Sequence, residues 1–397
     1  MIKRFFLCFF ALLIVGGGYC FPRIFKYPDP RDPHRYHHHL GDGCSEQDAI
    51  HSFYYWTKHG YLENGALPCR STDFTSHCVG YTHYPPLPQL MASWNLQLFG
   101  GVRDFIPALQ KTRVVFFLLD ALLAAFALAL ITAACFLGTW QTLLVSALLG
   151  FSKGFWLYAD NLYGHGYAVA IMGILIGLVL SQRPARPILQ EATALKLYAF
   201  FVFLCLWVDW EPAPTAWLLP GCFLFMDQDW RCRRPSALRF FKTAVVFSLL
   251  ALSCRLAQNA YGLGGLTAAL QDWFGAATAR SLDIGARGHG GTLHWNFGFM
   301  LHYLYRMAAG HFFMMRAAGA AAILLFMTAM IYKRRWRDIL FFIYVYLAAT
   351  SWNWIMLQHS IIHFFTQRYA VWPATLAFAL FLEWAALEAR NRRGIQK

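Results

Sequence analysis

Two carboxylates separated by one residue, Glu46 and Asp48, lie early in the polar stretch GCSEQDAIHSFYYWTKHG. A third, Asp160, lies in the short polar segment YADNLYGHG between two apolar stretches. A carboxylate in a partly dry cleft has a raised proton affinity, which suits it to take a proton from a hydroxyl or an amine. Glu46 and Asp48 also have a simpler interpretation, because acidic side chains in the first turn of a helix complement the helix dipole.

Cationic and aromatic side chains lie in other polar segments of the chain. The segment LQHSIIHFFTQRYAVWP contains His363, Arg368 and Tyr369, and Arg306 lies near the end of a second long polar segment. The planar fork of a guanidinium matches the oxygens of a phosphate, so these arginines are candidates for stabilising a phosphate leaving group.

Two further candidates flank Asp160 in the sequence, namely Lys153 and His165. Ionisable groups near membrane depth are costly, so they usually face a polar cavity. For Lys153 the alternative is a long side chain that extends along apolar surface to place its charge at the membrane surface.

The composition indicates that all these residues belong to a membrane protein. Of the 397 residues, 58% are hydrophobic and 14% are charged, with a mean hydropathy of +0.40. A soluble domain needs more charge to cover its surface. The net charge of +14 is divided among short basic clusters between apolar stretches. We therefore expect membrane lipids, and no nucleic acid, as the charged partners.

The apolar stretches predict an all-α, polytopic protein with about ten transmembrane helices. The first runs from Met1 to about residue 21, with a cleaved signal peptide as the alternative. The others are centred near residues 125, 148, 172, 203, 221, 248, 322, 347 and 379. Basic clusters near residues 185, 235 and 335 and in the carboxyl-terminal tail place both termini in the cytoplasm.

This topology places two long polar segments on the outer face. We divide the chain into a first span or signal anchor (1–22), a first outer loop (23–112), spans 2–7 (113–256), a second outer loop (257–312) and spans 8–10 with a cytoplasmic tail (313–397). In the first outer loop the apolar spacing predicts an amphipathic juxtamembrane helix capped by Ser45, and Pro85–Pro86 precedes a second helix.

The first outer loop also contains three cysteines, Cys44, Cys69 and Cys78. An oxidising compartment favours a disulfide there, with Cys69–Cys78 as the first choice, although spacing does not determine the pairing. The adjacent histidines 37–39 suggest a metal site, but three neighbours on an extended chain cannot all face one ion, which favours a solvated loop. Metal dependence stays open.

The order of these motifs resembles that of the GT-C fold glycosyltransferases, in particular the branch of protein O-mannosyltransferases and the aminoarabinose transferase of lipid A. The stretch EQDAIHSFYYW resembles the acidic motif of their first outer loop, and His83-Tyr84-Pro85-Pro86-Leu87 resembles the Pro-Pro-Leu motif that follows. Arg113, Asp160 and the Arg368-Tyr369 pair match later motifs. The likeness covers about the first 180 residues and residues 359–385, and the middle of the chain does not match.

The resemblance implies an inverting transfer, on the periplasmic or lumenal face, of a hexosyl or pentosyl group from a polyprenyl-phosphate donor to a lipid, glycan or protein acceptor. It assigns Asp48 as the catalytic base, Asp160 as the second acidic residue of the site and Arg368 as the residue that holds the donor phosphate. The substrate-binding set predicted around them consists of Glu46, His83, Tyr84, Lys153, His165, Arg306, His363, Arg368 and Tyr369.

Two other classes of protein compete with this interpretation. A secondary transporter would agree with the number of spans, but it predicts internal repeats and polar residues at the bilayer midplane. The notable polar groups lie instead at the outer ends of spans, with Asp120 as one exception. A structural membrane protein would leave the carboxylates and arginines without a role.

Overall fold

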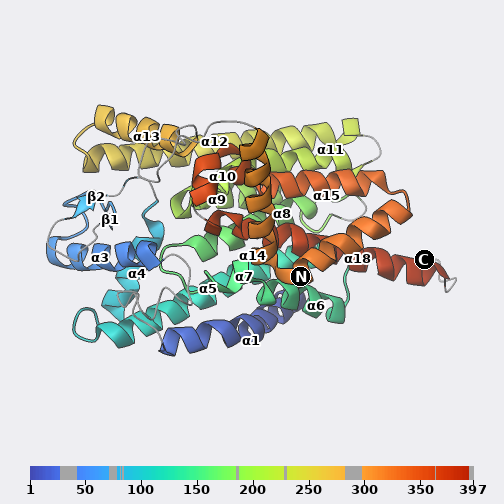
Figure 1. Ribbon diagram of the computed structural model, residues 1–397, viewed down its shortest axis with the longest axis horizontal. Coiled ribbons are helices and arrows are strands. Elements are labelled where there is room, and N and C mark those ends of the chain that lie inside the picture. Colours follow the sequence, from blue (N-terminus) through green and yellow to red (C-terminus); the bar gives the residue numbers. More distant parts are fainter. Residues whose placement is uncertain are drawn as a thin grey trace.

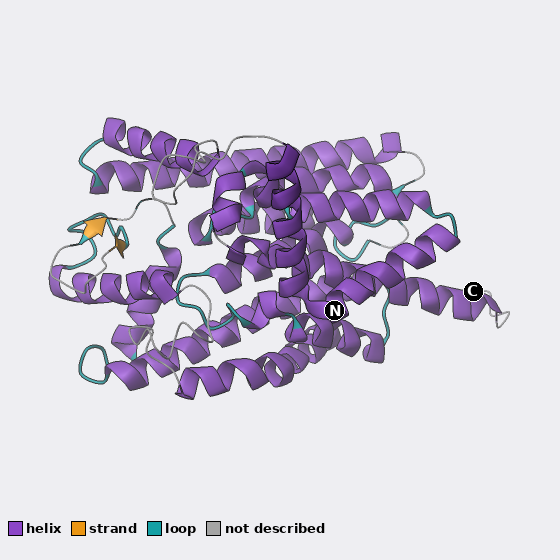
Figure 2. Ribbon diagram, in the orientation of Figure 1, coloured by secondary structure: helices purple, strands orange, loops and turns teal. Residues whose placement is uncertain are grey.

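The computed structural model describes residues 1–26, 43–70, 78–80, 82, 85–184, 187–227, 230–281, 297–362 and 364–392. These residues are almost entirely helical, as Figure 2 shows, with two strands of two residues each. This agrees with the predicted all-α class. Predicted site residues His83, Tyr84 and His363 lie outside the described residues, as do histidines 37–39.

Six helices are long and apolar enough to cross a membrane. They are α1 (Ile2–Lys26), α5 (Phe105–Ala134), α9 (Glu191–Val208), α12 (Trp230–Gly262), α14 (Phe297–Tyr332) and α18 (Val371–Arg392). Shorter helices lie at the other predicted stretches, namely α6 (Thr139–Phe151), α8 (His165–Leu180), the series α10 (Ala213–Leu218), η1 (Leu219–Cys222) and α11 (Phe223–Met226), and α15 (Trp336–Ala349). Every predicted apolar stretch is thus helical, while the number of ten crossings stays a prediction.

The segment 23–112, predicted as the first outer loop, contains the two predicted helices, α3 (Gly43–His59) and α4 (Leu87–Leu98). Between them, strands β1 (Cys69–Arg70) and β2 (Val79–Gly80) pair antiparallel, with Cys69 opposite Gly80. The disulfide joins Cys69 to Cys78, as predicted. Figure 1 places α3, α4 and the strands together at the end of the molecule opposite the carboxyl terminus.

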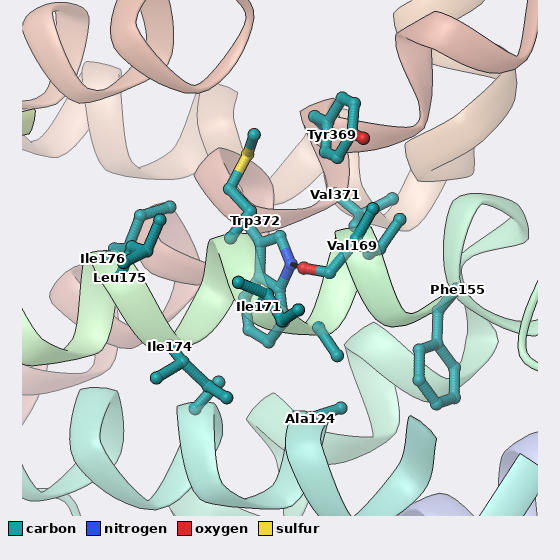
Figure 3. Packing of buried hydrophobic residues seen from close by; sticks show 14 of the residues in the cluster. Ala124, Phe155, Val169, Ile171, Ile174, Leu175, Ile176, Tyr369, Val371 and Trp372 are labelled. Atoms are coloured by element: carbon teal, nitrogen blue, oxygen red, sulfur yellow. Dashed lines mark hydrogen bonds between the residues drawn. The ribbon is translucent and has the colours of Figure 1, made fainter. Parts of the chain in front are cut away.

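Helix α8 forms the centre of the core. Its sequence is apolar around its whole circumference, and every one of its residues is buried, so it packs against neighbours on all sides. The indole of Trp372, on α18, packs onto Gly173, where any Cβ would collide with it, and its N–H donates to the carbonyl of Val169. Figure 3 shows this indole surrounded by side chains of α8. The packing fixes α18 against α8, and with it the residues just before each helix.

The segment 257–312, predicted as an outer loop, is partly helical. Helix α12 continues to Gly262, and α13 (Leu266–Ser281) turns back beside it (Figure 1). Helix α14 is broken at Arg316, whose backbone angles (φ 59°, ψ 177°) are not helical. The short elements that complete the site are α7 (Lys153–Trp156), α16 (Ser351–Ile355), α17 (Leu357–Ile362) and η2 (Phe364–Ala370).

Candidate functional site

A buried network of four charges joins α3 to α1, α5 and the segment that precedes α8. On α5, Arg113 donates from Nη2 to Glu46 Oε2 at 2.8 Å and from Nη1 to Asp160 Oδ2 at 3.0 Å. On α1, Arg23 pairs with Asp160 and also donates from Nε to Asp160 Oδ2 at 3.2 Å. The second oxygen of Glu46 accepts the backbone N–H of Leu162 at 3.0 Å. All four charged side chains are at most 5% exposed.

The two arginines balance the two carboxylates in this first network. Removing a charge from water costs several kcal/mol, which only close partners and hydrogen bonds offset. Burial raises the pKa of Glu46, and the attraction of Arg113 opposes that rise. The network therefore holds Glu46 and Asp160 in place, and Arg23 at the end of α1 is a member that the sequence did not single out.

A second buried network surrounds Arg368 on η2. Its Nη2 lies 2.7 Å from Asp209 Oδ2 and 2.7 Å from Glu211 Oε2, just beyond the end of α9. His165 Nδ1 lies 3.1 Å from the same oxygen of Asp209. Burial raises the pKa of Asp209, but the His165 hydrogen bond and the Arg368 charge outweigh it, so the pKa is lowered. The predicted residues His165 and Arg368 thus meet through a carboxylate.

Aromatic side chains complete the surroundings of Arg368. Its guanidinium carbon lies 4.6 Å from the ring centroid of Tyr369 and 5.7 Å from that of Tyr158. Its Nη2 donates to the hydroxyl of Tyr369 at 2.8 Å. Cation–π contacts with these two rings add to the ion pairs that hold the guanidinium in place. Tyr369, predicted with Arg368, therefore belongs to the same network.

Asp209 and Glu211 were missed at the sequence level. A signal for them was present, because Asp209-Trp210-Glu211 repeats the acidic-x-acidic spacing of Glu46-Gln47-Asp48 at the end of an apolar stretch. The segment lies in the middle of the chain, where the family resemblance does not extend.

Asp209 and Glu211 line a cavity of about 300 Å³. Four indoles contribute to its wall, and His359 and Thr82 add polar atoms. The full lining is Thr82, Leu206, Asp209, Trp210, Glu211, Ala213, Pro214, Trp217, Leu252, Trp273, Ala276, Trp352, Ile355, Met356 and His359. Segments that are far apart in the sequence thus meet around one hollow.

The wall of this cavity is held by polar contacts. The indole N–H of Trp352 donates to His359 Nδ1 at 3.1 Å, and that nitrogen lies 3.9 Å from Glu211 Oε1. Thr82 donates to the carboxylate of Asp272 on α13, and its carbonyl accepts Arg255 Nη2 at 3.3 Å. Thr82, α12 and α13 are therefore connected at the cavity.

The remaining predicted site residues lie in different surroundings. Asp48 lies on α3 near Glu46, and its side chain is half-buried. Lys153, also half-buried, lies at the start of α7. Arg306 is exposed on α14. Among the residues that the structure describes, no group of three or more His, Cys, Asp or Glu side chains is arranged to hold a metal ion.

Comparisons with known proteins give one structural likeness. No family model matches the chain, and no curated protein sequence matches it. The chain is similar to the crystal structure of the oligosaccharyltransferase of Archaeoglobus fulgidus in the apo form, with a TM-score of 0.53 and 11% sequence identity. The match covers 99% of this chain and 51% of that protein, so the chain spans about half its length. The likeness shows that this protein has the fold of that part of the oligosaccharyltransferase.

Proposed function

We propose that this protein is a membrane glycosyltransferase that transfers a sugar from a polyprenyl-phosphate donor to a lipid, glycan or protein acceptor. The shared fold with an oligosaccharyltransferase supports the general class. The ordered motifs around Glu46, Asp160 and Arg368 support the donor chemistry, and all three residues belong to buried charge networks.

We place the reaction on the side of the membrane away from the cytosol. On α1, Arg4 and Arg23 are separated by a helical rise of about 28 Å, close to the thickness of a bilayer core. Arg4 donates to the carbonyl of Leu137, whereas Arg23 belongs to the first network. Because basic clusters mark the cytoplasmic ends of spans, the first network lies at the opposite, outer end.

The observation that carries the proposal is the charge and shape of the cavity wall. Asp209, Glu211 and Arg368 together contribute one net negative charge, which repels a phosphate and attracts a hydroxyl or amine donor. The indoles of Trp210, Trp217 and others offer flat apolar surfaces on which the apolar face of a sugar ring packs. We therefore assign the cavity to a sugar ring of the acceptor or of the donor. Asp48, the proposed base, does not line the cavity, so the reacting atoms and the donor phosphate lie outside it.

Asp48 is the proposed catalytic base. Glu46 and Asp160 are buried and neutralised by arginines, whereas Asp48 is half-buried and nearer to solvent. The base takes the proton of the acceptor, whose oxygen or nitrogen bonds to the anomeric carbon from the face opposite the phosphate. The bond between that carbon and the phosphate oxygen breaks, and the lipid phosphate leaves with the electron pair. The product is inverted.

The remaining predicted residues have supporting roles in this proposal. Glu46 and Asp160 position α3 and the segment that precedes α8. The family resemblance assigned Arg368 to the donor phosphate, but its Nη2 is engaged by two carboxylates, so we propose instead that Arg368 orients Asp209 and Glu211. His83, Tyr84, Arg306 and His363 remain proposed substrate-binding residues.

Transfer by the purified protein tests the proposal directly. Incubation with radiolabelled polyprenyl-phosphate sugars should move label into a lipid, glycan or protein fraction. Asp48→Asn should reduce the rate about 100-fold or more, as loss of a general base does. Asp104→Asn, at an exposed carboxylate before α5, is the matched control and should retain the wild-type rate.

Three results would oppose the proposal. Undiminished transfer by Asp48→Asn would remove the assigned base, although the class would stand. Absence of transfer from every polyprenyl-phosphate sugar would contradict the class. Uptake of a solute into vesicles without transfer would favour a transporter instead.

A further inference from the structure

We infer that Lys153 and Arg316 form a binding site for the phosphate of a membrane lipid, at the outer edge of the hydrocarbon core. The site is separate from the carboxylate cavity. Its assignment to the sugar donor rests on the proposed function, whereas binding of a lipid phosphate does not.

The two cations are held over aromatic rings from three helices. Lys153 Nζ, on α7, lies 3.6 Å from the ring centroid of Phe313 on α14. The guanidinium carbon of Arg316 lies 5.5 Å from the centroids of both Tyr19 and Trp156. Arg316 Nη1 also donates to the hydroxyl of Tyr19 at 3.4 Å. The helix break at Arg316 is the point where its side chain joins this group.

Among the described residues, no negatively charged side chain neutralises either of these two cations. Neither Lys153 nor Arg316 forms an ion pair with a carboxylate there, and their charges repel each other. In contrast, Arg23, Arg113 and Arg368 each contact a carboxylate. Two half-buried cations next to each other are unfavourable unless an anion joins them.

A third donor points to the same ligand. The indole Nε1 of Trp156 is buried and has no hydrogen-bond acceptor among the described residues. Its ring contacts Arg316 and stacks on Tyr19, with 4.6 Å between ring centroids. The guanidinium lies over the indole, and the ammonium is near enough to the guanidinium to be repelled by it, so this region presents the donors that the oxygens of a phosphate require.

The depth of the site matches that of a lipid headgroup phosphate. Between Arg316 and Tyr332, where α14 ends before the basic residues 333–335, the helix rises about 24 Å, so Arg316 lies near the far edge of a core of roughly 30 Å. Neighbouring Phe312 and Phe313 are 54% and 45% exposed, and Phe151 is 48% exposed. Aromatic rings exposed at this depth are typical of a surface that contacts lipid.

The site adjoins the element that organises the carboxylate cavity. Gly154, the residue after Lys153, packs directly on η2, where an added Cβ would lie 2.8 Å from the carbonyl oxygen of Arg368. Arg368 in turn holds two carboxylates of the cavity wall. A lipid phosphate bound at Lys153 would therefore contact α7, whose neighbour η2 holds the carboxylates of the cavity wall.

Lipid binding by the full-length protein in detergent tests this inference. The probes are polyprenyl monophosphate, the uncharged polyprenol of the same length, and phosphatidylglycerol, with bound lipid measured by native mass spectrometry. Wild type should retain polyprenyl monophosphate at least tenfold better than polyprenol. Lys153→Gln combined with Arg316→Gln should remove that preference, and Lys153→Arg with Arg316→Lys should keep it. Lys242→Gln, an exposed cation on α12, is the matched control.

The outcomes separate the source of the phosphate and the fate of the proposed function. Preference for polyprenyl monophosphate over phosphatidylglycerol assigns the site to the donor, and equal retention of both assigns it to lipid phosphates in general. Equal retention of polyprenol by wild type, or an unchanged preference in the double Gln variant that elutes as a folded species, overturns the inference. If the protein binds polyprenyl monophosphate selectively but transfers no sugar, the proposed function is contradicted and the lipid phosphate site is still supported.

Discussion

Arg368 and Asp209, 159 residues apart in the chain, form a buried ion pair with 2.7 Å between Nη2 and Oδ2. Both side chains are at most 2% exposed. The pair joins η2 to the end of α9, next to a cavity that the sequence did not reveal. Because a buried charge without its partner is costly, this contact is a sensitive point for measuring how the site is assembled.

Replacing Arg368 should destabilise the protein strongly. Arg368→Met leaves Asp209 and Glu211 buried without their shared cation, and the expected loss is about 3–5 kcal/mol. Thermal unfolding in detergent measures it. The control is Arg239→Gln, which breaks the ion pair between Arg239 and Glu191. The side chain of Arg239 is 52% exposed, so this substitution should lower the stability by less than about 1 kcal/mol. Equal losses of stability in the two variants would show that the buried Arg368 ion pair contributes no more to stability than an exposed one.

The contact between Arg113 and Glu46 should appear as coupling between the two side chains. Arg113→Met alone leaves two carboxylates beside Arg23, whereas Arg113→Met with Glu46→Gln removes one charge of each sign. The double variant should therefore be more stable than the sum of the single losses predicts, by about 0.5–3 kcal/mol. Unfolding of the four proteins completes the cycle, and strictly additive losses would argue against the buried network.

Glu46 should make stability depend on pH. Burial raises its pKa above the ordinary value of 4.5, so the folded state binds the proton more tightly than the unfolded state. This contribution is fully present below pH 4.5 and is lost as the pH rises through the raised pKa. The unfolding temperature of wild type relative to Glu46→Gln should fall over that interval. A difference that stays constant with pH would mean that the pKa of Glu46 is not raised by the fold.

The disulfide should stabilise the hairpin of β1 and β2. Cys69 is fully buried and bonded to Cys78. Removing such a bond lowers the stability by about 2–4 kcal/mol, chiefly because the unfolded chain gains conformational entropy. Reductant should therefore lower the unfolding temperature of wild type and leave Cys69→Ser/Cys78→Ser unaffected. Cys254→Ser, which removes an exposed free thiol, should keep the wild-type response. If the reductant converts the disulfide to free thiols and the unfolding temperature of wild type does not change, the stability of the hairpin does not depend on the bond.

Local properties of the sequence determined the membrane architecture. A helix across lipid satisfies its own backbone hydrogen bonds and must be apolar along its length, so each apolar stretch was visible without its neighbours. Caps, prolines and spacing likewise indicated α3 and α4, and the Cys69–Cys78 pair lies close in the chain. The role of Asp48 and the number of crossings are sequence predictions that remain to be measured.

Only the tertiary structure decided which charges meet. Asp160 pairs with Arg23 across 137 residues and Glu46 with Arg113 across 67, and no local pattern encodes such distances. Asp209 and Glu211 gain their partner Arg368 because α18 packs on α8 through Trp372, which brings η2 to the end of α9. Charge pairing follows the packing of apolar helices, which is a property of the whole chain, and so the partners of each polar residue could not be obtained from its sequence neighbours.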